Sequence, residues 1–216
     1  NIVLGGYGSD VIVTGDGADL ILGDNGKFTY TTTLGVTKLT RAETTDPDGT
    51  TGAADTIVMG GGTTQNIVLA GMGGDLLNGP AYTATGTTGT ASSGDDIVLG
   101  DNGYVIWDVD GVIQEFASTL PTLGGDDVID VGDGKNIVVG GIGKDDITTG
   151  SGDDVLLGDS GQVKYFLSPR VAKVESAESI APANGDDDVI RAGEGNNIVL
   201  GGMGADTITG GSGSGI

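Results

Sequence analysis

Short aliphatic runs recur along the chain, and a glycine-rich polar turn separates each run from the next. Val11–Val13 follows the turn Gly5–Asp10, and Leu20–Leu22 follows the turn Thr14–Asp19. Three residues are enough for a very short strand whose central side chain points to one side. The nine-residue period of turn plus strand therefore predicts stacked short strands rather than helices.

These segments share the form G-G-x-G-x-D-x-U-x, where U is a large aliphatic residue. Further copies lie at Gly140–Thr148, Thr149–Leu157 and Gly201–Thr209, with degenerate copies at Ala70–Asn78, Val131–Val139 and Ala192–Leu200. Glycine suits tight bends and close backbone approach. Two nonapeptides make one coil of turn, strand, turn and strand, so turns on the same edge recur about every eighteen residues.

A longer period, close to 65 residues, lies on top of the nonapeptide, because similar blocks open at Asn1, Asn66, Asn136 and Asn197. After the loops 23–26, 100–103 and 158–161 the nonapeptide stops, and a β-rich insert with most of the aromatic residues follows. We expect hairpin or loop inserts at about 27–52, 81–93, 104–123 and 162–184 in one continuous array over 1–216. The hairpin turns are expected at Leu34-Gly35, Asp110-Gly111 and Ser168-Pro169, and 81–93 as a polar loop.

No capping repeat is visible at either end, and the Asp expected at Gly215 is missing. Solenoids normally carry atypical capping repeats. We therefore expect the chain to be a fragment of a longer repeat protein.

The composition limits the kinds of partner and of metal site that the chain can have. Acidic residues outnumber basic ones 31 to 9, which argues against nucleic acid or an anionic membrane as a partner. The chain has no apolar run long enough to span a membrane. It has neither cysteine nor histidine, which removes thiolate sites and the commonest zinc ligand and general base. The oxygen ligands that remain suit calcium or magnesium.

Stacked turns would form ladders of carboxylates and glycine carbonyls in which two adjacent turns surround one ion. On this arrangement Asp10 stacks on the loop of Asp24, and Asp145 on that of Asp159. The expected ligands are Asp10, Asp19, Asp24, Asp75, Asp96, Asp101, Asp127, Asp145, Asp154, Asp159, Asp188 and Asp206. Weaker ligands are expected at Asn1, Asp55, Asn66, Asn136 and Asn197, and at the backbone carbonyls of Gly6, Gly8, Gly15, Gly17, Gly141, Gly143, Gly150, Gly152, Gly202 and Gly204.

The tandem G-G-x-G-x-D-x-U-x copies resemble the RTX family, the hemolysin-type calcium-binding repeat proteins. The resemblance covers roughly two-thirds of the chain and leaves out the inserts. It implies an all-β fold, a right-handed parallel β-roll (RTX β-solenoid), here with β-hairpin inserts. It also implies several Ca²⁺ ions, on the order of ten, disorder without calcium, type I secretion and folding outside the cell. The arrangement of repeat blocks with hairpin inserts resembles the long arrays of giant RTX surface proteins.

Other interpretations of these sequence motifs are less well supported. Flexible linkers lack such strict phase, and the glycine motifs lack the helix and the Lys or Ser/Thr of phosphate loops. The Asn25-Gly26 and Asn102-Gly103 pairs fit both plain turns and a ligating role for Asp24 and Asp101. The insert aromatics suit packing better than sugar binding. With every carboxylate explained by the repeat, we expect no enzyme and no catalytic residue in this segment.

The leading functional hypothesis is a calcium-stiffened structural segment of a large secreted adhesin or extracellular surface filament. Its partners would be calcium and further copies of the array or other surface proteins, without nucleic acid or membrane insertion. One alternative is the C-terminal calcium-dependent secretion and folding module of an exported RTX enzyme or toxin. A lesser alternative, an ice- or surface-binding roll, would need a flat, regular row of threonines.

Overall fold

The computed structural model describes residues 1–78, 92–166 and 173–213. These residues form three β-sheets, and no helix occurs among them, so nothing in this part of the chain could cross a membrane as a helix. Two seven-stranded parallel sheets are built from the nonapeptides, and one six-stranded antiparallel sheet is built from the inserts. The predicted all-β fold with parallel sheets is confirmed, whereas the handedness of the coil stays a prediction.

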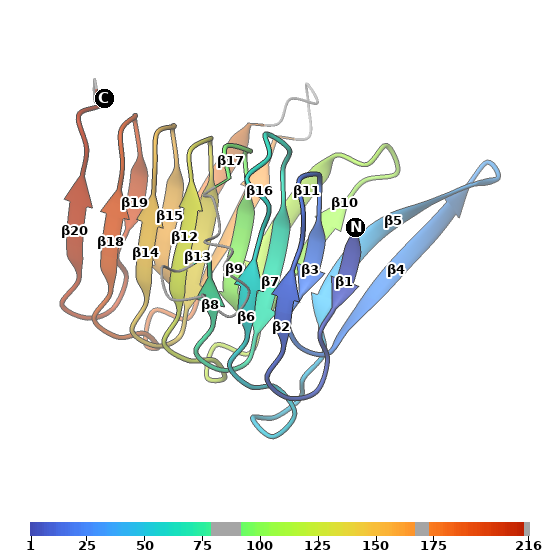
Figure 1. Ribbon diagram of the computed structural model, residues 1–216, viewed down its shortest axis with the longest axis horizontal. Coiled ribbons are helices and arrows are strands. Elements are labelled where there is room, and N and C mark those ends of the chain that lie inside the picture. The colour runs from blue at the N-terminus through green and yellow to red at the C-terminus, as the bar shows by residue number, and fades with distance from the viewer. Residues whose placement is uncertain (79–91, 167–172, 214–216) are drawn as a thin grey trace.

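The first parallel sheet, sheet A, is made of one strand from each coil. In spatial order it contains β1 (Ile2–Leu4), β3 (Leu20–Leu22), β7 (Ile67–Gly71), β9 (Ile97–Asp101), β13 (Ile137–Gly141), β15 (Val155–Asp159) and β19 (Ile198–Leu200). Sheet B takes the other strand of each coil. It contains β2 (Val11–Val13), β6 (Thr56–Val58), β8 (Leu76–Leu77), β12 (Val128–Gly132), β14 (Asp146–Thr149), β18 (Val189–Ala192) and β20 (Thr207–Gly210). Figure 1 shows the strands of both sheets stacked side by side along the long axis.

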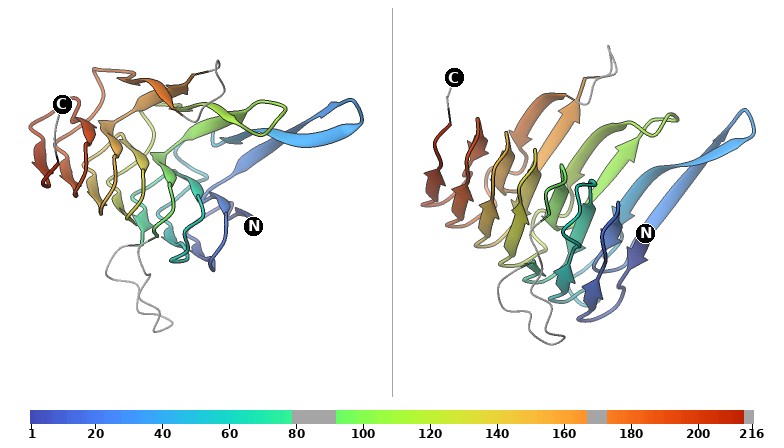
Figure 2. Two further views of the ribbon diagram at one scale, coloured as in Figure 1. Left: turned by 90° about the horizontal axis from the view of Figure 1, so that it is seen from above. Right: turned by 45° about the horizontal axis from the view of Figure 1, so that its top comes forward.

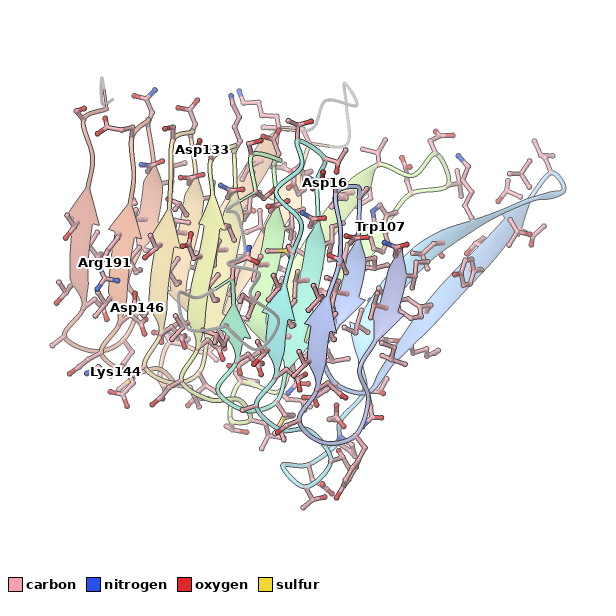
Figure 3. All side chains as sticks on the ribbon, in the orientation of Figure 1. Asp16, Trp107, Asp133, Lys144, Asp146 and Arg191 are labelled. Atoms are coloured by element: carbon pink, nitrogen blue, oxygen red, sulfur yellow. The ribbon has the colours of Figure 1, made fainter. Side chains whose placement is uncertain are left out.

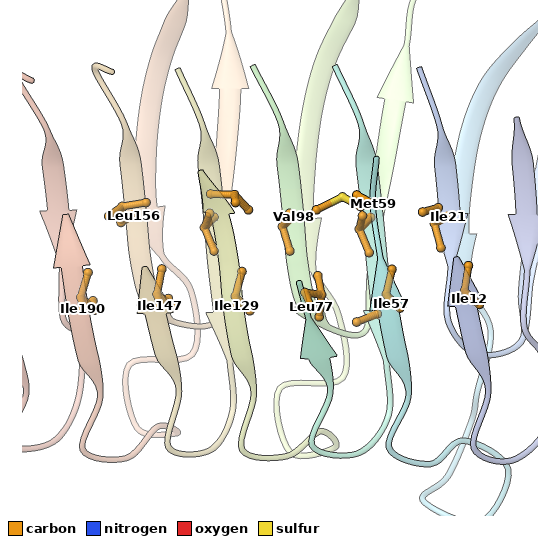
Figure 4. Packing of buried hydrophobic residues seen from close by; sticks show 14 of the residues in the cluster. Ile12, Ile21, Ile57, Met59, Leu77, Val98, Ile129, Ile147, Leu156 and Ile190 are labelled. Carbon is orange, nitrogen blue, oxygen red and sulfur yellow. The ribbon is translucent and has the colours of Figure 1, made fainter. Parts of the chain in front are cut away.

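The core between sheets A and B is a double row of aliphatic side chains, to which every strand except the exposed β20 contributes. Parallel register places Ile21 beside Val68 in sheet A and Ile12 beside Ile57 in sheet B. The rows continue through Val98, Val138 and Leu156 on one side and Leu77, Ile129, Ile147 and Ile190 on the other. Figure 4 shows the two rows facing each other. One inward side chain per three-residue strand gives a thin core, as the sequence predicts.

The third sheet, sheet C, lies over the outer face of sheet A. In spatial order it contains β17 (Val174–Ser179), β16 (Gly161–Tyr165), β11 (Ile113–Ser118), β10 (Gly103–Trp107), β5 (Val36–Thr44) and β4 (Gly26–Thr33), all antiparallel. Figure 2 shows these strands on one side of the roll only. Phe116 and Tyr165 pack here against the outward side chains of sheet A, such as Leu99 and Leu157.

The middle strands of sheet A are therefore buried on both faces and begin with apolar runs such as Ile67–Leu69, whereas the end strands β1 and β19 are partly exposed. Sheet B is covered on its inner face only, so its strands alternate, and Val11 and Val13 are exposed on either side of buried Ile12. Figure 3 shows Asp146 and Arg191, which form an ion pair on the outer face of sheet B.

Long and short turns alternate along the edge where the chain passes from sheet A to sheet B. Short turns follow β1, β7, β13 and β19, whereas the long connections after β3, β9 and β15 carry the strand pairs of sheet C. β4 and β5 pair around Leu34 and Gly35, and β10 and β11 around the Asp110-Gly111 turn. The turn expected at Ser168-Pro169 and most of the insert 81–93 lie outside the described residues.

Candidate metal sites along the two edges of the roll

A continuous ladder of aspartates follows one edge of the roll, which we call the acidic ladder. Each member directly precedes a strand of sheet B, and its backbone N–H donates to Oδ1 of the next member at 2.7 to 3.1 Å. The ladder runs through Asp10, Asp55, Asp75, Asp127, Asp145, Asp188 and Asp206. It crosses all seven coils without a break.

The second carboxylate oxygen of these residues has no partner. Oδ2 is buried and accepts no hydrogen bond in Asp10, Asp55, Asp75, Asp127, Asp145 and Asp188. Among the described residues, no Lys or Arg forms an ion pair with a member of this ladder. A buried carboxylate oxygen without a donor costs free energy unless a proton or a cation satisfies it.

Glycine carbonyls of the next coil face the same positions. A Cβ added at Gly140 would collide with Oδ2 of Asp145 and with the carbonyl oxygen of Gly158. The same arrangement recurs at Gly5, Gly100 and Gly158, and at Gly23 the facing carbonyl belongs to Ala70. Each turn thus aims one free carboxylate oxygen and one carbonyl oxygen of the neighbouring coil at a spot that only glycine leaves open. Sequence reasoning missed the carbonyls of Gly23, Gly140, Gly158 and Gly201, since it considered the later turn glycines instead.

The carboxylates of the acidic ladder repel one another. Burial, reinforced by neighbouring carboxylates, raises the pKa of Asp75 and of Asp145 to about 8 each. Burial and the charges of Asp101 and Asp145 raise the pKa of Asp127 well above its usual value. The pKa of Asp188 is raised to about 7 and that of Asp55 to about 6, again chiefly by burial. The ion-free fold therefore favours neutralisation along this edge.

The loop aspartates Asp24, Asp101 and Asp159 form a second set beside the acidic ladder. Their carboxylates accept backbone N–H groups from the turn of the following coil, from Met72, Ile142 and Met203 respectively. Burial raises the pKa of Asp24 to about 7. One free oxygen remains in this set, Oδ1 of Asp159, which is buried without a partner.

The structure adds detail to the predicted stacking of the turns. The turn of Asp10 does stack on the loop of Asp24, since the N–H of Gly6 donates to the carbonyl of Gly23. The carboxylate that meets Asp10, however, belongs to Asp55, and the one that meets Asp145 belongs to Asp188. Each insert ends in a second acidic turn that resumes the ladder, so Asp55 lies between Asp10 and Asp75 in it, and its strength as a metal ligand stays a prediction.

The opposite edge carries a different ladder, which we call the mixed ladder, in which Asn and Asp alternate strictly. Its members precede the strands of sheet A, and N–H groups again donate to Oδ1, at 2.7 to 3.2 Å. The order is Asn1, Asp19, Asn66, Asp96, Asn136, Asp154 and Asn197. In Figure 3, Asp16 and Asp133 mark this edge and Lys144 the acidic one.

Side-chain amides fill the turns of the mixed ladder with donors. Nδ2 of Asn136 donates to the carbonyl oxygens of Gly132, Asp133 and Gly134 at 3.1 to 3.4 Å, and Nδ2 of Asn197 donates to that of Gly193. An NH₂ group thus lies where several carbonyls converge, which is the position a cation would take. Sequence reasoning placed weaker sites at these asparagines, and the geometry supplies a physical reason for that expectation.

The aspartates of the mixed ladder experience less repulsion, because each lies between two neutral amides. Burial raises the pKa of Asp96 to about 6 and also raises that of Asp154. Burial alone would raise the pKa of Asp19, but hydrogen bonds from the terminal ammonium of Asn1 and from Thr14 lower it below the usual value. Oδ2 of Asp19, Asp96 and Asp154 is nonetheless buried without a partner.

The donor set fits a hard divalent cation. Within the described ranges, no three acidic side chains gather into a metal-binding cluster. The oxygens come instead from carboxylates and glycine carbonyls of stacked turns, and calcium accepts such mixed sets. The glycines expected to contribute carbonyls divide between the edges, with Gly6, Gly8, Gly141, Gly143, Gly202 and Gly204 on the acidic edge and Gly15, Gly17, Gly150 and Gly152 on the mixed edge. Their ligating role stays a prediction.

Comparison with known proteins agrees with this geometry. The model of the RTX calcium-binding nonapeptide repeat matches in four copies, over residues 1–27, 130–162 and 182–216. Searches of curated proteins and of solved structures each found no match. The matched segments contain the first member and the last members of each ladder, and they leave out the sheet C strands β5, β10, β11 and β17. These three segments of the chain therefore carry the RTX calcium-binding nonapeptide repeat.

Proposed function

We propose that this chain is a structural segment of a large secreted adhesin or extracellular surface filament, and that calcium folds and stiffens it outside the cell. The observation that carries the proposal is the row of unpartnered Oδ2 atoms in the acidic ladder, which links all seven coils. A cation between successive members would clamp each coil to the next. Its effect would therefore extend along the full length of the roll.

The ligands proposed are the free oxygens of the acidic ladder, with the loop aspartates Asp24, Asp101 and Asp159 beside them. Asp19, Asp96 and Asp154 of the mixed ladder would bind more weakly, because their neighbours are neutral amides. These amides donate either to the carboxylates themselves, as in Asn1 and Asn66, or to turn carbonyls, as in Asn136 and Asn197. Calcium would supply positive charge to the ladder carboxylates, none of which forms an ion pair with Lys or Arg among the described residues. The chain itself supplies the spacing, since glycine keeps each cation position open.

The magnitudes agree with calcium-controlled folding. An extracellular calcium module binds with a Kd of ~10⁻⁴ M, so each site adds about 1.4 kcal/mol of stability at millimolar calcium. About ten independent sites would contribute on the order of 14 kcal/mol, comparable with the whole net stability of a typical domain. At submicromolar calcium this contribution nearly vanishes, whereas the repulsion between buried carboxylates remains.

The second candidate is the secretion and folding module of an exported enzyme. It uses the same calcium chemistry but does not have to bear mechanical force. What favours the spacer is sheet C, because three pairs of insert strands join alternate coils into a third layer. This layer adds lateral stiffness that a folding module does not require. The outer face of sheet B disfavours ice binding, since Val128, Asp146, Val189 and Thr207 share one row.

Titration and stretching test the proposal together. Circular dichroism of the chelated chain should change from coil to β-structure as calcium is added, and EDTA should reverse the change. Optical-tweezers stretching along the long axis should then give a higher unfolding force in calcium than in magnesium. Full β-structure after thorough chelation would overturn the calcium role. A low unfolding force that calcium does not change would overturn the spacer role alone.

A further inference from the structure

The loop that follows the first strand pair of sheet C differs from its two counterparts. All three loops start alike, because the N–H groups of Thr45, Thr119 and Ile180 donate to the carbonyls of Asn25, Asn102 and Ser160. All three also end alike, at glycines that face the loop aspartates, namely Gly52, Gly124 and Gly185. The first loop is two residues longer between these points and alone contains the sequence Asp46-Pro47-Asp48.

Asp46 is buried in this longer loop, with 1 % of its surface exposed. Its Oδ1 accepts hydrogen bonds from Nδ2 of Asn25 at 2.8 Å and from Oγ1 of Thr51 at 2.5 Å, which fix the carboxylate. Its Oδ2 is also buried and has no hydrogen-bond partner. Nothing in the nonapeptide pattern requires an acidic side chain here, so the ladders do not account for it.

A second buried carboxylate lies beside it. Asp24 is fully buried, precedes Asn25 in the chain, and is close enough to Asp46 for the charge of Asp46 to act on it. Two basic side chains of the first insert, Lys27 and Arg41, both pair with Glu43. Within the described residues, no cationic side chain pairs with either aspartate. Two buried negative charges thus share a loop with no positive charge of its own.

Burial of an unpaired carboxylate is costly, and a bound divalent cation is the usual way to compensate for two of them. We propose that Asp46 and Asp24 hold one further divalent cation, calcium by ligand type, in the loop 45–52 and outside the two ladders. Oδ2 of Asp46 is the free ligand, and the Asp24 carboxylate supplies the second charge. Loop oxygens and water would complete the coordination. The ion fastens the base of β4 and β5 to the first coil, where Gly8 donates to the carbonyl of Thr51.

This inference deepens the proposed function, because it adds a site to the same calcium-binding segment. Native mass spectrometry of the full chain in calcium counts the ions. The Asp46→Asn variant keeps the size and the Oδ1 acceptor and should bind one calcium fewer than the wild type. The matched control is Asp48→Asn, because Asp48 is exposed and its Oδ1 caps the turn at Thr50. The control should bind as many ions as the wild type.

Wild-type stoichiometry in Asp46→Asn would overturn the proposal. Should this variant fold poorly, Thr51→Val removes the orienting hydroxyl and leaves both charges in place. It should weaken one calcium site several-fold in equilibrium dialysis, and unchanged binding at every site would again overturn the proposal. Asp127→Asn provides a reference for the acidic ladder. If this variant loses an ion while Asp46→Asn binds as many ions as the wild type, the proposed site at Asp46 is wrong and the calcium sites of the ladder are not.

Discussion

The backbone N–H of Asp127 donates to Oδ1 of Asp145 at 2.9 Å, while Oδ2 of Asp145 is buried without a partner. One oxygen of the carboxylate thus holds the neighbouring coil, and the other is left for a ligand. The same two roles recur along the acidic ladder. Removal of one oxygen should therefore change the stability of the fold differently with and without calcium.

Asp127→Asn should test this difference. The amide retains the Oδ1 acceptor for Asp75 and replaces the free oxygen with a donor. In calcium, the free energy of unfolding should fall by about 1.4 kcal/mol, the contribution of one site. After chelation it should rise, because a buried charge has been removed. Urea denaturation under both conditions measures the two free energies of unfolding. Equal changes of the same sign would contradict the different roles of the two carboxylate oxygens.

Asn136→Asp should have the reverse effect on the mixed ladder. The amide that now donates to three carbonyl oxygens would become a carboxylate that faces them and Asp154. We expect the chelated chain to lose stability and the calcium-loaded chain to bind one additional ion. Isothermal titration calorimetry measures the stoichiometry. An unchanged number of ions would mean that the amide does not occupy a cation position.

Gly140→Ala should disrupt one site through steric overlap. The added methyl group would collide with Oδ2 of Asp145 and the carbonyl of Gly158, and overpacking of this kind costs about 1–3 kcal/mol. Gly15→Ala is the matched control, because nothing lies within 4 Å of its Cβ position. Thermal denaturation in calcium compares them, and equal loss of stability in both variants would argue against the crowded position.

Acid should stabilise the chelated chain. The pKa values of Asp75 and Asp145 are raised to about 8 in the fold, whereas in the unfolded chain they return to the usual value near 3.8. The folded state therefore binds more protons between these values, and its stability falls as pH rises from about 4 to about 8. Circular dichroism in EDTA across this range checks the sign. Greater order at pH 8 than at pH 5 without calcium would refute it.

The strands and the ladders follow from the sequence because the nonapeptide is local. Gly5–Asp10 and Val11–Val13 fix a turn and a strand within nine residues, and stacking of identical units then aligns Asp127 with Asp145. The pairing of Asp10 with Asp55 is not local, since the first insert separates them by 45 residues. Sequence spacing alone offers no means of knowing where the interrupted turn resumes.

Local sequence patterns also could not predict the third layer, sheet C. The sequence indicates strands in the inserts, but their partners come from other inserts, as in the pairing of Tyr104 with Glu43. One signal was present. Strands such as Ile67–Leu69 are apolar at every position, whereas Asp146–Thr148 alternates between polar and apolar residues. A strand with two apolar faces is typical of a sheet that is covered on both sides.

The alternation of long and short connections has a geometric consequence for how such an array can grow. Neighbouring strands lie about 4.8 Å apart, so two coils advance the roll by roughly 9.6 Å, which is the width that one pair of antiparallel strands occupies. The insert strands therefore tile the roll without gap or overlap because only every second coil carries them. Insertion or deletion of a single coil would put the third layer out of step with the other two, so the unit of change in length is a pair of coils.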